Sequence, residues 1–143
     1  MRIKIDLSEI KDLLKKYRNG LVKGVRESMF VAEQWSKQSF GKPGHLQSRT
    51  GNLRRSINTE VEDNGKSVIG IIGTAVKYGP IHETGGTIRP VKGKYLKFAI
   101  KGQWKSVREV TIPARPYLQP SLTENRDKIR DIIIRNITEE SNK

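Results

Sequence analysis

The sequence predicts an α+β protein, in which an antiparallel β-sheet of about four strands, in two hairpins, packs against a long N-terminal helix and a C-terminal helix. Apolar residues recur every three or four positions before residue 39 and again after residue 116, which is the period of an amphipathic helix. Residues 54–112 instead alternate in the manner of β-strands and are punctuated by glycine-containing turns. Strands that are grouped between two helices favour the α+β class.

The N-terminal region predicts a short strand at residues 2–6 and then one long helix over residues 8–39. A helix of this length would extend about 48 Å at about 1.5 Å per residue, which exceeds a compact domain of this size. Either the helix bends at Gly20 or Gly24, or it projects beyond its globule, or the two glycines admit a neighbouring backbone. The apolar stripe expected to face the core consists of Ile10, Leu14, Tyr17, Leu21, Val25, Met29, Ala32 and Trp35.

The middle of the chain predicts a mobile connector and then the first hairpin. Residues 41–51 are rich in glycine and polar residues, which is typical of a connector. Residues 54–63 and 66–74 flank Asn64-Gly65, which is the strongest short hairpin signal. Isoleucines fall on both faces of residues 69–73, so we expect this strand to be covered on both faces over part of its length.

A second hairpin and a last helix follow. Residues 94–100 and 104–112 are predicted to pair around a turn at residues 101–103, which places the β-sheet at residues 54–112. Pro113 and Pro116 force an extended exit, and a C-terminal helix is predicted over residues 116–138. With 143 residues, the chain has the length of a single domain.

Residues 77–89 predict a shaped structural turn between the hairpins. Tyr78, Gly79 and Pro80 would turn the chain. Gly85 and Gly86 would supply a positive φ or a close backbone approach that a β-carbon obstructs. We expect two further side chains, His82 and Glu83, to hold this turn through hydrogen bonds, with His82 partly packed under Tyr78.

The net charge of +13 is unevenly distributed. Between residues 87 and 116 there are eight basic residues and one acidic residue, Glu109. Such charge favours contact with a polyanion, because bound Lys and Arg release counterions from phosphates. A solubilising surface, or a basic face against an acidic subunit, is the alternative. The candidate contacts to a partner or to DNA are Arg49, Arg54, Arg55, Arg89, Lys92, Lys94, Lys101, Lys105 and Arg108.

The residue inventory predicts no catalytic site, no cofactor and no metal. The chain has no cysteine and two histidines, whereas zinc sites take three or four ligands. His82 and Glu83 also lack an evident nucleophile or carboxylate cluster with which to act as an acid–base pair. No apolar run reaches the length of a membrane span, so we expect a soluble cytoplasmic product without a targeting signal or a membrane partner.

Four motifs, in order along the chain, resemble one protein family. Residues 78–86, Tyr-Gly-Pro-Ile-His-Glu-Thr-Gly-Gly, resemble the Tyr-x-x-Ile-His-Glu-Phe-Gly-Gly signature of bacteriophage virion morphogenesis proteins, also called tail completion, tail-to-head joining or minor tail proteins. Thr84 departs from the aromatic residue that is usual there. The other three matching segments are residues 49–57, residues 95–98 and residues 110–118.

The resemblance implies a non-enzymatic structural protein of a phage or prophage particle, made in the bacterial host cytoplasm and carried in the virion. It implies tail completion or head–tail joining, with further copies of the chain and other neck or tail proteins as partners. A closed ring is the expected assembly, because heterologous interfaces generate rings when the rotation closes. The alternative function is a basic nucleic-acid-binding module that contacts DNA phosphates through the hairpin at residues 89–108.

Overall fold

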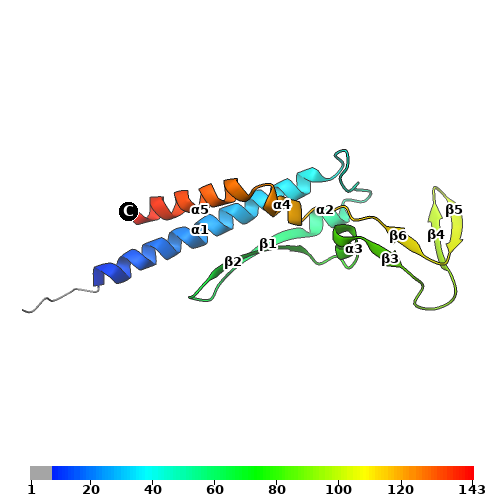
Figure 1. The fold of residues 1–143 in the computed structure, drawn as a ribbon, viewed down its shortest axis with the longest axis horizontal. Helices are drawn as coiled ribbons and strands as arrows, with labels where there is room; N and C mark the ends of the chain where they lie inside the picture. Colours follow the sequence, from blue (N-terminus) through cyan, green and yellow to red (C-terminus); the bar gives the residue numbers. More distant parts are fainter. Residues whose placement is uncertain (1–7) are drawn as a thin grey trace, which may run out of the picture.

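The computed structural model describes residues 8–143, and the strand predicted at residues 2–6 lies outside this range. The α+β class, the long N-terminal helix and the C-terminal helix are confirmed. Figure 1 shows an elongated molecule with two long helices side by side, a β-hairpin beneath them and an arm at one end. The elements, in chain order, are α1 (Ser8–Ser39), α2 (Asn52–Ser56), β1 (Ile57–Asp63), β2 (Val68–Thr74), α3 (Gly79–Thr84), β3 (Gly86–Ile88), β4 (Leu96–Ile100), β5 (Gln103–Val107), β6 (Val110–Ile112), α4 (Gln119–Thr123) and α5 (Arg126–Ser141).

Helices α1 and α5 pack closely because small residues line the contact. A β-carbon on Gly20 would lie 2.6 Å from the Ile137 Cα, and one on Gly24 would lie 2.8 Å from the Ile133 Cα. Helix α1 is continuous through both positions, so the glycines serve close approach of a neighbouring backbone and mark no break in the helix. The same face continues, four residues apart each time, through buried Ser28, Ala32 and Ser36.

The N-terminal part of α1 lacks the predicted cover. Val25, Met29 and Ala32 are buried as predicted, whereas Leu14 is 62% exposed and Ile10 and Tyr17 are also exposed. The prediction for this part of the stripe is wrong, because no other described residues extend over the first turns of α1 (Figure 1). An apolar period identifies a face but not the element that covers it.

The β1–β2 hairpin lies along α1 with one face inward. Antiparallel pairing runs from Ile57 opposite Thr74 to Asp63 opposite Val68. The strand predicted to begin at residue 54 begins at Ile57 instead, because Asn52–Ser56 form α2. The predicted turn at Asn64-Gly65 is confirmed, since Gly65 has φ 87° and the Asn64 side chain accepts backbone bonds within the loop.

Met29 of α1 sits directly over the inner face of this hairpin. A β-carbon on Gly70 would lie 2.6 Å from the Met29 Sδ, so α1 approaches the strand closely there. The prediction that residues 69–73 are covered on both faces is wrong. Ile69 is 46% exposed and Ile71 is 41% exposed on the outer face, since α1 covers only one side of the ribbon.

The remaining strands form an arm, defined here as residues 86–112. Strand β3 pairs with β6, and β4 pairs with β5, so the six strands form three two-stranded sheets instead of one sheet of about four. The predicted strand at residues 104–112 is therefore divided, with β5 and β6 pairing with different partners. Local alternation does not specify which strand is the partner, which is why the pattern suggested a single sheet.

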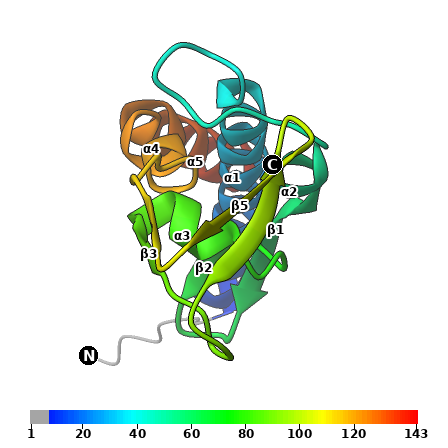
Figure 2. The same cartoon turned by 90° about the vertical axis from the view of Figure 1, so that its right-hand side faces the viewer.

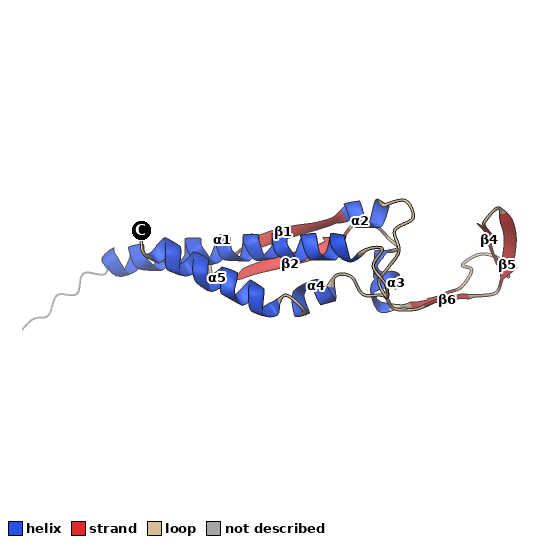
Figure 3. Ribbon diagram, turned by 90° about the horizontal axis from the view of Figure 1, so that it is seen from above, coloured by secondary structure: helices blue, strands red, loops and turns tan. Residues whose placement is uncertain are grey.

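The arm extends away from the helices. Figure 2, seen from the arm end, places the β4–β5 hairpin in front of the rest of the molecule, and Figure 3 shows it across the far end of the β3–β6 pair. Lys101 and Gly102, with φ 50° and 79°, form the two-residue turn between β4 and β5. Positive φ at both residues is typical of a type I′ hairpin turn, whose backbone twist matches the twist of the two strands.

The predicted C-terminal helix at residues 116–138 is two helices, α4 and α5. Asn125 lies between them with φ −100° and ψ 11°, and its side-chain amide donates to the Ser121 carbonyl. Short polar side chains that bond the backbone compete with helix continuation, which explains the break. Helix α5 extends to Ser141, where Glu140 pairs with Lys23 of α1 and with Lys143. No helix in the described part of the chain is long and apolar enough to cross a membrane.

Candidate functional site: the motif junction and the arm

Three of the sequence motifs converge where α1 ends, in a region that we call the motif junction. Its core cluster contains Leu46, Leu53, Ile57 and Tyr117, with Phe40 packed edge-on at 5.4 Å from the Tyr117 ring centroid. Tyr117 is 1% exposed, and its carbonyl accepts a 2.6 Å hydrogen bond from the Ser36 hydroxyl. These contacts join residues 46–57 and residue 117, which lie far apart in the sequence, to the end of α1.

Helix α3 begins inside the predicted turn. Pro80 stands in its first turn, where a missing N–H is tolerated and the fixed φ suits the helix. A β-carbon on Gly79 would lie 2.5 Å from the Thr74 Cγ2 and 2.9 Å from the Tyr117 hydroxyl oxygen. The turn predicted at residues 78–80 is therefore the start of a six-residue helix packed against the junction core.

Glu83 holds a segment more than thirty residues away. Its carboxylate accepts backbone N–H bonds from Tyr117 at 2.8 Å, from Leu118 at 3.0 Å and from Gln119 at 2.8 Å. Gln119 is the first residue of α4, Leu118 is its N-cap and Tyr117 precedes both, and free N–H groups at the N-terminus of a helix favour a negative charge. The prediction that Glu83 holds its own turn is wrong, because the carboxylate instead caps a distant helix.

His82 and the glycines complete the base of the arm. The His82 ring packs edge-on against Tyr78 with centroids 6.0 Å apart, as predicted, and the His82 carbonyl accepts the Arg115 N–H at 2.8 Å. The prediction that the His82 side chain holds the turn through hydrogen bonds is wrong, since it forms none among the described residues. Gly85 has φ 71°, and a β-carbon there would lie 2.8 Å from the Ala114 nitrogen. Gly86 begins strand β3 without a positive φ, so the expectation of a left-handed backbone holds for Gly85 alone.

A cleft of about 370 Å³ opens beside the junction. Its wall includes Phe40, Leu46, Arg49, Tyr78 and His82. Arg49, a predicted contact residue, therefore lies in the same cleft as Tyr78 and His82 of the motif at residues 78–86. Arg54 and Arg55 line a neighbouring surface hollow. Arg55 also has a local role, since it donates to the Thr50 carbonyl and to the Asn52 side chain.

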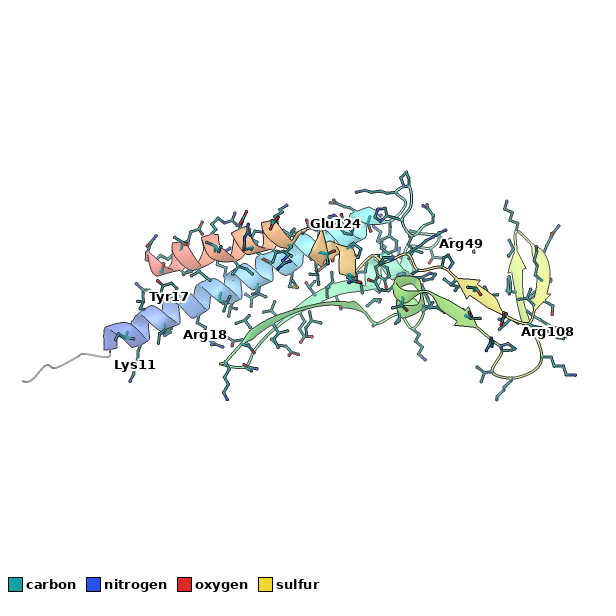
Figure 4. All side chains as sticks on the ribbon, in the orientation of Figure 1. Lys11, Tyr17, Arg18, Arg49, Arg108 and Glu124 are labelled. Carbon is teal, nitrogen blue, oxygen red and sulfur yellow. The ribbon has the colours of Figure 1, made fainter. Side chains whose placement is uncertain are left out.

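The predicted contact residues fall into two separate groups. Arg49 lies at the motif junction, whereas Arg108 lies far out on the arm (Figure 4). All of the predicted basic residues in both groups are exposed. On the arm, Arg89 pairs with Glu109 at 3.0 Å, and the other basic side chains form no ion pair among the described residues. The arm bases are Arg89, Lys92, Lys94, Lys97, Lys101, Lys105 and Arg108.

Sequence reasoning missed the parts played by Tyr117 and Ser36. Tyr117 belonged to a recognised motif, but nothing in its neighbours indicated that Glu83 would reach its backbone. Ser36 lies on the small-residue face of α1, and the regular spacing of that face was the available signal. Within residues 8–143, no three His, Asp or Glu side chains are grouped closely enough to bind a metal ion.

Replacing Tyr117 with phenylalanine is expected to leave the free energy of unfolding unchanged or to raise it by about 1 kcal/mol. The Tyr117 hydroxyl is buried without a hydrogen-bond partner in residues 8–143, so its removal relieves a desolvation penalty. Burial, with a smaller contribution from the Glu83 charge, raises the pKa of Tyr117 from 10.0 to about 12.

The same substitution should remove part of the alkaline sensitivity. The unfolded tyrosine ionises near pH 10, whereas the folded one stays neutral until about pH 12, so wild-type stability falls across this interval. Urea unfolding at pH 8 and pH 11 measures both effects. A loss above 1 kcal/mol at pH 8 would show that the hydroxyl has a partner.

Comparison of the sequence with models of known protein families gives a match that includes the motif junction and the arm. The model of the phage virion morphogenesis family matches residues 28–138, which is more than three quarters of the chain and covers the junction, the arm and most of α5. The chain has no significant match among curated proteins or solved structures. On the strength of the family match, this chain belongs to the phage virion morphogenesis family and has a role in building the phage particle.

Proposed function

We propose that this protein is a non-enzymatic structural subunit that acts in tail completion or head–tail joining, as one member of a closed homo-oligomeric ring in the virion. The observation that carries the proposal is the arm. It belongs to the matched family region, yet it has no extensive contact with α1 or α5 among the described residues.

The arm also exposes apolar side chains that a neighbour would cover. Val91 is 98% exposed and Trp104 is 79% exposed, with Ile88, Tyr95 and Ile100 also exposed. Contiguous exposed apolar surface is typical of protein interaction sites. Further copies of this chain and other neck or tail proteins are the proposed partners.

The decisive experiment uses a phage or prophage that carries this gene. Loss of the protein is expected to give filled heads and tails that do not join, or tails of faulty length. Cryo-microscopy of complete particles should locate several copies in one ring at the neck or tail end. Infectious particles of normal form without the protein, or scattered single copies, would contradict the proposal.

Contact with DNA is the second candidate, favoured by the charge of the arm. Its 27 residues carry seven bases and one acid, and such a ribbon could contact phosphates inside a ring through which DNA passes. The two functions are compatible in one protein.

Changing Lys92, Lys94, Lys101 and Lys105 together to Glu is expected to shift the melting temperature by only a few degrees. All four side chains are exposed, and exposed charges contribute little to stability. Retention of the purified protein on DNA at low salt should fall strongly if the arm contacts phosphates. Unchanged retention would remove the DNA function, and unfolding would show that these side chains are packed.

A further inference from the structure

We propose that the arm of one copy docks on the outer face of the β1–β2 hairpin of the next copy. The outer face is defined here by Asn58, Glu60, Glu62, Ile69 and Ile71. This inference rests on the proposed ring and specifies which surfaces form its subunit contact.

The outer face is an acidic and apolar surface without cover. Glu60 pairs across the ribbon with Ile71, and Glu62 pairs with Ile69, so each acid stands beside an exposed isoleucine. Neither glutamate forms an ion pair or a side-chain hydrogen bond among the described residues. Helix α1 packs on the opposite side of the ribbon, which leaves this face open (Figure 1).

The arm has the complementary chemistry. Strand alternation puts Lys97 and Ala99 of β4 on the same side of the hairpin, and Ala99 pairs with Trp104 of β5. Trp104 is thus an exposed aromatic beside a lysine. Tryptophan is enriched among the residues that dominate binding at protein interfaces. Apolar contact of Trp104 with the isoleucines would bring Lys97 close to the glutamates.

Charge favours this pairing over pairing of like surfaces. The arm carries a net charge of +6, whereas residues 57–74 carry three acids and one base, a net charge of −2. Two arms would repel each other, and opposite potentials steer the correct contact. Exposed apolar side chains are not needed for phosphate binding, so they favour a protein surface as the occupant of the arm.

The arrangement of the two surfaces makes the contact intermolecular. The arm points away from the β1–β2 hairpin of its own chain (Figures 1 and 3). Because two different surfaces meet, the interface is heterologous. Each copy contributes its arm to one neighbour and its outer face to the other. Repetition of this contact closes into a ring if the rotation permits.

Charge reversal in two separate variants tests the pairing. One variant carries Lys97→Glu on the Trp104 side of the arm, and the other carries Glu60→Lys on the outer face. Each alone should self-associate at least tenfold more weakly than wild type, as measured by sedimentation over a concentration series. Circular dichroism melting should show that both remain folded, since Lys97 and Glu60 are exposed.

Mixing the two variants tests whether the two surfaces bind each other directly. The new glutamate on the arm of the first variant then meets the new lysine on the outer face of the second, while the native arm of the second matches the native face of the first. Alternating assembly should therefore return to within about threefold of wild type, although neither variant assembles alone. The matched control carries Lys105→Glu, which makes the same charge change as Lys97→Glu on the other face of the hairpin, and it should associate like wild type.

Cross-linking gives an independent measurement, because the chain has no native cysteine. Ser106→Cys on the Trp104 side of the arm and Asn58→Cys on the outer face, mixed as two proteins, should give a cross-linked dimer with a short bis-maleimide. Thr123→Cys on α4, which is exposed and belongs to neither surface, should give none with either partner.

Several results would overturn the contact. These are wild-type association by the arm variant, a mixture that stays dissociated, absence of the cross-link, or a wild-type protein that is monomeric at all concentrations. Loss of DNA retention with unchanged self-association would assign the arm to DNA instead. The proposed ring is tested separately. If particles contain no ring of this protein, the proposed ring is wrong. If particles contain the ring but the charge variants self-associate like wild type, only this contact is wrong.

Discussion

Glu83→Ala is expected to lower the free energy of unfolding by about 3–5 kcal/mol, since each buried donor left unsatisfied costs about 1–3 kcal/mol. Three backbone N–H groups, of Tyr117, Leu118 and Gln119, lose their acceptor at the start of α4. The loss is below the sum of three full penalties, because the Gln119 donor is exposed and water can replace the carboxylate there.

Glu83→Gln should have a smaller effect, about 1–2 kcal/mol, because an amide oxygen still accepts hydrogen bonds but without the negative charge. Urea unfolding measures both. Glu109→Ala is the matched control, since this arm carboxylate is exposed and pairs only with Arg89, and it should change stability by less than about 1 kcal/mol. Equal effects of Glu83→Ala and Glu109→Ala would contradict the capping role.

Glu83 should also control assembly, because it stands at the base of the arm. Helix α3 leads directly into β3, and residues 113–116 lead from β6 to the capped segment. In Glu83→Gln the arm should lose its fixed orientation while the protein remains folded. Amide exchange would then rise in β3 and β6 and stay unchanged at the α1–α5 contact.

Gly24→Val should lower the free energy of unfolding by about 3 kcal/mol or more, a severe case of overpacking. The new β-carbon would lie 2.8 Å from the Ile133 Cα, which is backbone and cannot rotate away. The helices would separate, and buried Val25 and Ile132 would gain water contact. Gly24→Ala should cost less, about 1–2 kcal/mol, because alanine recovers about 1 kcal/mol of helix propensity.

The control for this prediction is Asn19→Val on the same helix. Asn19 is exposed, and valine and asparagine have similar helix propensity, so the midpoint of urea unfolding should stay near the wild-type value. If Gly24→Ala were more stable than wild type, the glycine would act only through helix propensity, and α5 would not pack closely on this face.

The long helix α1 and the first hairpin turn were predictable because local rules determine them. The apolar period of residues 8–39 predicts the span of α1, which needs no long-range partner for its detection. Asn64-Gly65 predicts the β1–β2 turn, since Gly65 takes the positive φ that glycine favours. The His-Glu-x-Gly-Gly pattern predicted a shaped turn, and Gly85 has the positive φ that was expected there.

The partners of these elements were decided only by the tertiary structure. Nothing near Glu83 in the sequence reveals that its carboxylate caps α4, and an alternating strand pattern does not distinguish one four-stranded sheet from three separate pairs. The two helix glycines fit a kink and a close contact equally well until α5 is placed beside them. Local sequence determines which elements form and which faces are apolar, whereas contacts between residues far apart in the chain decide which faces are buried and which stay open for a partner.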